Sequence, residues 1–323
     1  MHYLRLNLHV RGAGMQQSPS VITPAPVLAC VLFAHALDKK LDDALDVQGV
    51  GIVHHSAQPW LEHIDAKGFV QSSVIDRRGA TLFEPGKVKQ GVMTHSAQTQ
   101  PMTSLHYTLV LEVRYELPLK QVRQRVQAMR LAGGTIEQAH ARFFDDLPSA
   151  LRSISKGFWV QDATREVWGA LEPDADLLSS CLQQLARRDL GWLAPVNLGY
   201  SLLGPAQPRE GARDGAPHAF AEHLLGVVRF VPLRKLAALR PPTADAQDAE
   251  DADNDCADEL AQVLDRLEAA SAPNTAEMTE LHESTVLEGA AQRLPLWTYG
   301  WVGDEFVTTN DPALQELLVS SPR

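Results

Sequence analysis

Residues 105–136, LHYTLVLEVRYELPLKQVRQRVQAMRLAGGTI, combine a strand, a helix and the start of a returning strand. Apolar and polar residues alternate over 105–113, and β-branched and aromatic side chains are frequent, which predicts a β-strand. Pro118 fits the first turn of a helix, where a backbone N–H is not needed, and an apolar face follows it at helical spacing. Gly133 and Gly134 predict the end of this helix, because glycine adopts a left-handed cap without a Cβ clash.

The polar face of the same helix carries Lys120, Arg123 and Arg130, and Gly133 and Gly134 leave their backbone N–H groups uncovered. Cations beside exposed backbone N–H groups are suited to holding a phosphate. The alternative is a solvated helix face with an ordinary cap, since glycine caps end roughly a third to a half of helices.

The N-terminal part of the chain contains the same kinds of element. Residues 3–10 alternate as a half-buried strand, Pro26 opens an apolar helix over 27–41, and 47–55 form the next strand. Together with 105–136 they give the order β-α-β-β-α-β, which predicts an α+β protein with a ferredoxin-like or RNA-recognition-type sheet.

The boundary of this first domain is placed at residue 145, and an insertion over 56–104 separates its two halves. A mixed α/β region over 146–323 follows, with further strands and turns expected at 191–205 and 296–308. Within the insertion, a projecting hairpin with an aromatic residue and four cations near its tip would suit single-stranded nucleic acid. These residues are Arg77, Arg78, Phe83, Lys87 and Lys89. A flexible polar loop is the alternative.

The formal net charge of the 323-residue chain is −11, but the acidic residues are unevenly distributed. Residues 242–290 contain 14 acidic residues and one basic residue, and the rest of the chain holds 28 basic and 26 acidic residues. The tract 241–258 is too polar to pack and is expected to be a disordered loop. A nearly neutral body leaves room for local electropositive patches, so the acidic total does not exclude a nucleic-acid partner.

Several functional classes lose support from absent motifs. The sequence has no phosphate loop, dinucleotide fingerprint, HExxH or paired CxxC motif, so we expect no cofactor and no metal site. The three cysteines are far apart and odd in number, which favours a reducing compartment. No apolar stretch approaches the roughly 20 residues that span a bilayer, and no signal peptide is evident, so we predict a cytoplasmic protein without membrane contact.

Five segments together resemble the second Csy subunit of type I-F CRISPR surveillance complexes, a Cas-five-type RAMP protein. They follow the order of that family along the chain: LFAHAL at 32–37, DVQGVGIVHH at 46–55, QAMRLAGGTI at 127–136, GWLAPVNLGY at 191–200 and, more loosely, FAEHLLGVVRFVPLRKLAAL at 220–239. MRLAGG and GWLxPxxxGY are specific in combination. The sequence DRRGATLFEPGKVK departs from the Arg-Asn-Pro-containing segment that the family has in its insertion.

The resemblance implies a non-catalytic subunit with an RNA-recognition fold and an inserted thumb hairpin. Such a subunit binds the 5′ handle of the CRISPR RNA (crRNA) and caps the tail of the backbone, next to the large subunit. Target DNA is held by the assembled complex, where guide pairing supplies the sequence specificity. Arg123, Arg130, Gly133 and Gly134 are expected to contact handle phosphates, and the five residues of the insertion are expected to form the thumb contacts.

Two other functions are kept open. A metal-independent endoribonuclease that cuts CRISPR precursors needs a general base, for which His35 or His106 is the candidate. A protein-binding adaptor would use the acidic tract and exposed apolar faces, and would have no affinity for RNA.

Overall fold

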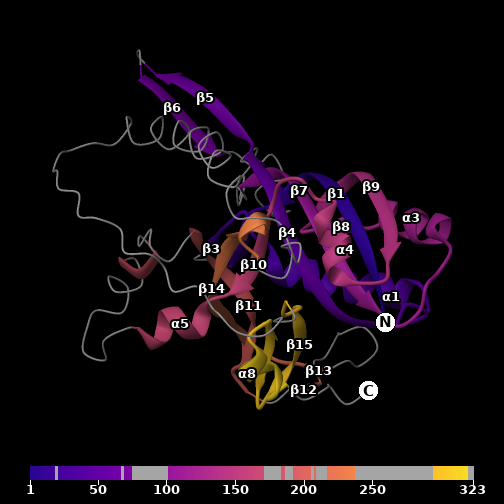
Figure 1. The fold of residues 1–323 in the computed structure, drawn as a ribbon. Coiled ribbons are helices and arrows are strands. Elements are labelled where there is room, and N and C mark those ends of the chain that lie inside the picture. The colour runs from indigo at the N-terminus through magenta and orange to yellow at the C-terminus, as the bar shows by residue number, and fades with distance from the viewer. Residues whose placement is uncertain are drawn as a thin grey trace, which may run out of the picture.

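The computed structural model describes residues 1–18, 21–66, 69–74, 101–170, 183–185, 192–204, 207–208, 217–236 and 294–318. A ten-stranded sheet dominates it, in the order β15-β16-β11-β14-β10-β4-β7-β1-β9-β8. Its paired strands are antiparallel (Figure 1). The predicted α+β class is therefore confirmed.

Six elements in chain order build one half of this sheet. They are β1 (His2–Gly14), α1 (Val27–Lys40), β4 (Val47–Pro59), β7 (Met102–Val113), α3 (Leu119–Gln127) and β9 (Gly134–Phe144). β1 and β7 lie in the middle, with β4 outside β7 and β9 outside β1. The strands and helices predicted for residues 3–10, 27–41, 47–55, 105–113 and the segment after Pro118 are all present.

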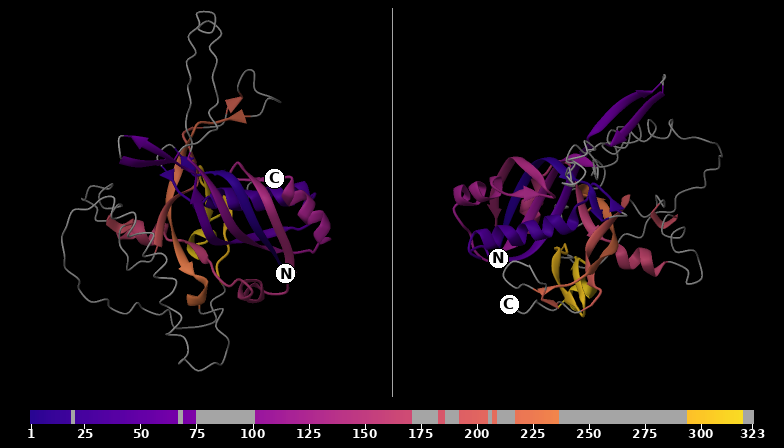
Figure 2. Two further views of the ribbon diagram at one scale, coloured as in Figure 1. Left: turned by 90° about the horizontal axis from the view of Figure 1, so that it is seen from above. Right: turned by 180° about the vertical axis from the view of Figure 1, so that it is seen from behind.

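The main hydrophobic core lies between this half of the sheet and helices α1 and α3. Leu4, Leu6 and Leu8 alternate along β1 and are fully buried against the helices, together with apolar residues of β4 and β7. From α3, Val122 and Val126 join the same core. In the view from behind, α1 lies across the sheet (Figure 2).

Part of the opposite face is covered by α4 (Leu147–Arg152) and the 3-10 helix η2 (Leu233–Lys235). Tyr3, Val53 and Val110 point to this side and pack with Leu147 and Leu151 in a second hydrophobic cluster. Beside this cluster, the part of the face formed by Arg5, Asn7 and His9 of β1 is polar, and it forms the candidate site described below.

The sheet continues past β4 through the second half of the chain. The remaining elements are β10 (Phe158–Asp162), α5 (Thr164–Gly169), β11 (Trp192–Leu202), β14 (Ala221–Pro232), β15 (Thr298–Val302), β16 (Glu305–Thr309) and α8 (Pro312–Gln315). β10 pairs with β4, and Trp297 bridges to Val50. One sheet thus crosses the predicted domain boundary at residue 145, and the division into two domains stays a prediction about folding units.

Three small hairpins stand apart from the main sheet. They are β2 (Gln16–Ser18) with β3 (Val21–Ile22), β5 (Leu61–Ala66) with β6 (Phe69–Val74), and β12 (Gln207–Pro208) with β13 (Pro217–His218). The β5–β6 hairpin projects away from the sheet at the end of β4 (Figure 1). β4 keeps pairing with β7 up to Pro59, so the predicted insertion over 56–104 begins within the last residues of β4.

The expected glycine cap of the second helix is wrong. α3 ends at Gln127, and β8 (Arg130–Leu131) then pairs with Gly134 and Thr135 at the start of β9. Ala132 and Gly133, with φ of 49° and 77°, form the two-residue turn of this hairpin. Left-handed backbone at both central positions matches the twist of antiparallel strands, so Gly133 serves a hairpin turn.

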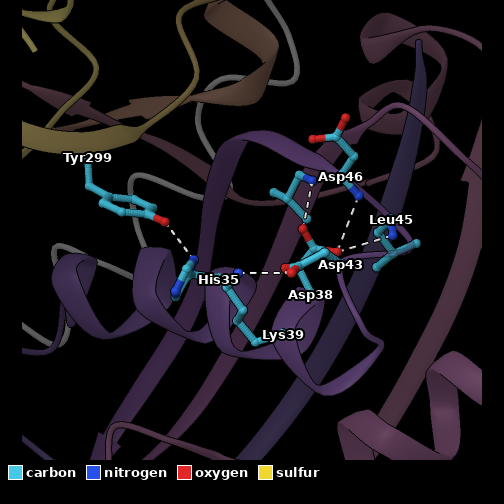
Figure 3. Close-up of polar contacts among 8 residues, drawn as sticks. His35, Asp38, Lys39, Asp43, Leu45, Asp46 and Tyr299 are labelled. Carbon is cyan, nitrogen blue, oxygen red and sulfur yellow. Dashed lines mark hydrogen bonds and ion pairs between the residues drawn. The ribbon is translucent and has the colours of Figure 1, made fainter. Parts of the chain in front are cut away.

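The connection from α1 to β4 is fixed by one buried carboxylate. Asp38, which is 8% exposed, accepts hydrogen bonds from the backbone N–H groups of Leu45, Asp46 and Val47 at 3.1, 3.2 and 3.1 Å (Figure 3). Asp46 itself has a left-handed φ of 52°. The carboxylate thus satisfies N–H groups that the tight turn leaves without backbone partners.

Candidate nucleic-acid interface

The polar part of the sheet face opposite α1 is formed mainly by alternate residues of β1. Arg5, Asn7 and His9 lie between the buried leucines of this strand and point to the other side. Several of their neighbours across the sheet are also polar, since Arg5 pairs with Arg142, and His9 with His106. This face, which we call the open face, is therefore rich in cations and imidazoles.

Three histidines from three strands stack on the open face. The ring centroids of His9 and His106 are 4.0 Å apart, and those of His106 and His55 are 4.2 Å apart, with interplanar angles of 18° and 23°. His55 faces out because alternation along β4 places it opposite His54, whose ring is buried in the core against Tyr107. A β-bulge between His54 and Ser56 then pairs Ser56 with His106, so Ser56 follows His55 on the same face.

His55 is held at both ring nitrogens. Nδ1 lies 2.8 Å from the carbonyl oxygen of Lys156, which only accepts, so Nδ1 carries the proton. Nε2 lies 2.8 Å from the hydroxyl of Thr108, which donates to it when the ring is neutral. Gly157 permits the approach of this turn, because a Cβ there would lie 2.7 Å from Cγ1 of Val53.

His106 is the central ring of the stack and is neutral at physiological pH. Partial burial, together with the neighbouring His55 and His9, lowers the pKa of His106 to about 4. Its Nε2 lies 3.1 Å from Oδ1 of Asn7, which orients the ring. Contact with the neighbouring rings thus disfavours charge on His106.

A surface pocket of about 350 Å³ opens beside the stack. Its lining residues come from β1, β4, β7 and the turn after α4: Arg5, Asn7, His55, Ser56, His106, Ser153, Ile154, Ser155 and Lys156. No carboxylate is among them. Arg5 and Lys156 form no ion pair with any residue in the described ranges.

Three arginines stack on aromatic rings, and one of them, Arg5, lines the pocket. The guanidinium carbon of Arg5 lies 4.7 Å from the ring centroid of Phe144, and that of Arg142 lies 5.0 Å from the same ring. Further along the face, Arg11 lies 5.8 Å above the ring of Trp60. Stacking on Phe144 keeps the guanidinium groups of Arg5 and Arg142 extended, whereas Arg11 also pairs with Glu137 at 3.5 Å.

The predicted handle-binding residues lie elsewhere, on α3 and the β8–β9 hairpin. Arg123 and Arg130 are exposed, and their guanidinium groups donate to the carbonyls of Ala141 at 3.1 Å and Gly133 at 3.4 Å. Gly134 is buried, and a Cβ there would lie 2.6 Å from Cγ1 of Val10 in β1. Close packing of two strands accounts for this glycine, whereas Gly133 is exposed at the turn.

The five predicted thumb residues, Arg77, Arg78, Phe83, Lys87 and Lys89, lie outside the described residues, as does the acidic tract 241–258. Of the predicted insertion, the structure describes the β5–β6 hairpin, which ends at Val74, before these five residues.

The two histidines considered as general bases differ in their surroundings. His35 lies on α1, and its Nδ1 is 2.6 Å from the hydroxyl oxygen of Tyr299 in β15 (Figure 3). This contact ties the C-terminal hairpin to α1, on the far side of the sheet from the pocket. His106, in contrast, lines the pocket.

Sequence reasoning did not identify Arg5, Asn7, His9 or Lys156 as site residues. A usable signal was present, because the polar residues that alternate with buried leucines in β1 must face away from the helices.

No helix in the part of the chain that the structure describes is long and apolar enough to cross a membrane.

No protein-family model matches this chain, and no curated protein has a significantly similar sequence.

Proposed function

We propose that this chain is the non-catalytic crRNA-binding subunit of a type I-F CRISPR interference complex, built on a ferredoxin-like RAMP unit. One observation carries the proposal: a projecting hairpin is inserted between β4 and β7 of a unit ordered β9-β1-β7-β4, with α1 and α3 on one face. This arrangement is the one that the resemblance of the five sequence segments implies. The cationic open face supplies the electrostatics that an RNA backbone requires.

In this function the chain binds the 5′ handle of the crRNA in the cytoplasm. It caps the tail of the backbone next to the large subunit, and the assembled complex holds the target DNA. The exposed positions of Arg123, Arg130 and Gly133 leave the β8–β9 turn accessible to a phosphate.

The test is co-expression of the tagged chain with a CRISPR array and sequencing of the RNA that co-purifies after nuclease treatment. We expect guides with one uniform repeat-derived 5′ end. Recovery of folded protein without RNA, with the partner proteins present, would refute the proposal and favour the adaptor function.

Charge reversal tests the predicted handle contacts. The double variant Arg123→Glu with Arg130→Glu should bind handle RNA more weakly. The slope of log Kd against log salt should also fall by about the amount expected for two phosphate contacts, because two such contacts are lost. Lys39→Glu with Lys40→Glu, an equal change of charge at the exposed end of α1, is the matched control. Equal affinities of both double variants at every salt concentration would refute these contacts.

A second candidate function, metal-independent RNA cleavage, is favoured by the surroundings of His106. His106 lines the pocket together with Arg5 and Lys156, so a candidate general base and two cations face the same cavity. Incubation of the purified chain with repeat RNA in the presence of a chelator decides between the two functions. Cleavage that disappears in His106→Asn would establish the nuclease, and intact RNA supports the non-catalytic role.

A further inference from the structure

We propose that the pocket between β1, β7 and the turn after α4 binds a phosphate ester, that is, one phosphate group with its attached sugar. The pocket lies on the open face and is distinct from the handle contacts assigned to α3 and the β8–β9 hairpin. An RNA origin of this phosphate rests on the proposed function, whereas the chemistry of the pocket does not.

Among the described residues, no carboxylate balances the positive charge of Arg5. Arg5 is half-buried, and its guanidinium donates to the carbonyl of Ala150 at 3.0 Å and to the hydroxyl of Ser153. Burial and the nearby Arg142 lower the pKa of Arg5, so the folded chain disfavours this charge as it stands. Since no carboxylate in the described ranges pairs with Arg5, an anion in the pocket would supply the missing partner.

The polar groups that face the pocket also favour an anion. Lys156 and Arg5 only donate hydrogen bonds, and the hydroxyls of Ser56, Ser153 and Ser155 can all donate. Phosphate oxygens only accept, and hydrogen bonds from cations to them are among the strong ones. A metal ion or an organic cation would find no carboxylate here, which leaves an anion as the matching ligand.

The size of the pocket also suits a phosphate ester. The volume of about 350 Å³ lies at the lower end of the roughly 300–1,000 Å³ of small-molecule sites, and far above the ~30 Å³ share of one water molecule. The pocket can therefore hold more than a bare phosphate. The imidazoles of His55 and His106 form one wall, on which the sugar can pack.

Adenosine 5′-monophosphate (AMP) is the probe for the test, with adenosine and inorganic phosphate beside it, each added to the full-length chain. Binding is followed by calorimetry and by the imidazole NMR signals of His55 and His106. We expect saturable shifts with AMP, competition by inorganic phosphate and no shifts with adenosine. Lys156→Ala should weaken AMP binding about tenfold, because it removes one ammonium while the backbone carbonyl that holds His55 stays in place.

Lys40→Ala, an exposed lysine at the end of α1, is the matched control and should bind AMP like the wild type. Equal AMP affinity of Lys156→Ala and Lys40→Ala, or equal effects of AMP and adenosine, would overturn the proposal. Competition by a short single-stranded RNA identifies an RNA strand as the source of the phosphate, and competition by mononucleotides alone identifies free nucleotides. If handle RNA still co-purifies but AMP does not bind, the pocket proposal fails and the proposed function stands.

Discussion

Replacing His54 by leucine should remove a large part of the chain's loss of stability in mild acid. His54 is 7% exposed, its ring lies between those of Tyr107 and Phe230 at centroid distances of 5.0 and 5.2 Å, and its Nδ1 has no hydrogen-bond partner. Burial, followed by the nearby His55 and His106, lowers the pKa of His54 from 6.5 to about 4.

The sign of the effect follows from proton binding. Between pH 6.5 and about 4 the unfolded chain protonates His54 and the folded chain does not, so the free energy of unfolding falls as the pH falls through this range. At about 1.4 kcal/mol per pKa unit, the loss attributable to His54 is about 3 kcal/mol between pH 7 and pH 4. Well above pH 6.5, His54 is neutral in both the folded and the unfolded chain, so it no longer makes stability depend on pH.

Urea denaturation followed by tryptophan fluorescence at pH 7, 5.5 and 4.5 measures this loss. His54→Leu conserves volume and removes an unsatisfied nitrogen, so its stability at pH 7 should lie within about 1 kcal/mol of the wild type. At pH 4.5 the variant should be more stable than the wild type by about 2 kcal/mol. His140→Leu, which removes an exposed histidine from β9, is the control and should follow the wild type. Parallel pH profiles for the wild type and His54→Leu would refute the reasoning.

Three further substitutions test the packing of the sheet and its turns by urea denaturation at pH 7. Gly51→Ala should cost about 1–3 kcal/mol, because its Cβ would lie 2.5 Å from the Trp159 ring, whereas Gly204→Ala meets no atom within 4 Å and should be nearly neutral. Gly134→Ala should cost a similar amount, since its Cβ would lie 2.8 Å from a backbone nitrogen of β1; a neutral result would show that the two strands can separate easily. Asp38→Ala leaves three backbone N–H groups of the α1–β4 turn without their acceptor and should cost about 1–3 kcal/mol, and a smaller loss would mean that water replaces the carboxylate.

Only part of the candidate site was accessible to sequence reasoning. His106 was predicted as a possible general base, and the structure places it in the pocket, but no sequence pattern joined it to His9 or His55. Arg123 and Arg130 are exposed as the helical pattern predicted, although Arg130 lies in β8 rather than on the helix. A glycine pair after an apolar helical face fits a helix cap and a hairpin turn equally well, and pairing with β9 decided between them.

The sequence by itself determined the elements of the first half of the chain and the side of each strand that is buried. Two local patterns carry this information: the alternation along β1 and β7, and the apolar faces of α1 and α3. Because folding buries apolar surface, these patterns determine which side of each element faces the core. Only the tertiary structure decided that His9, His55 and His106 meet. Their contact depends on the register of three strands, which long-range pairing sets. The pocket likewise exists only because the turn at Lys156, more than 100 residues after β1 in the chain, packs on the sheet beside β1.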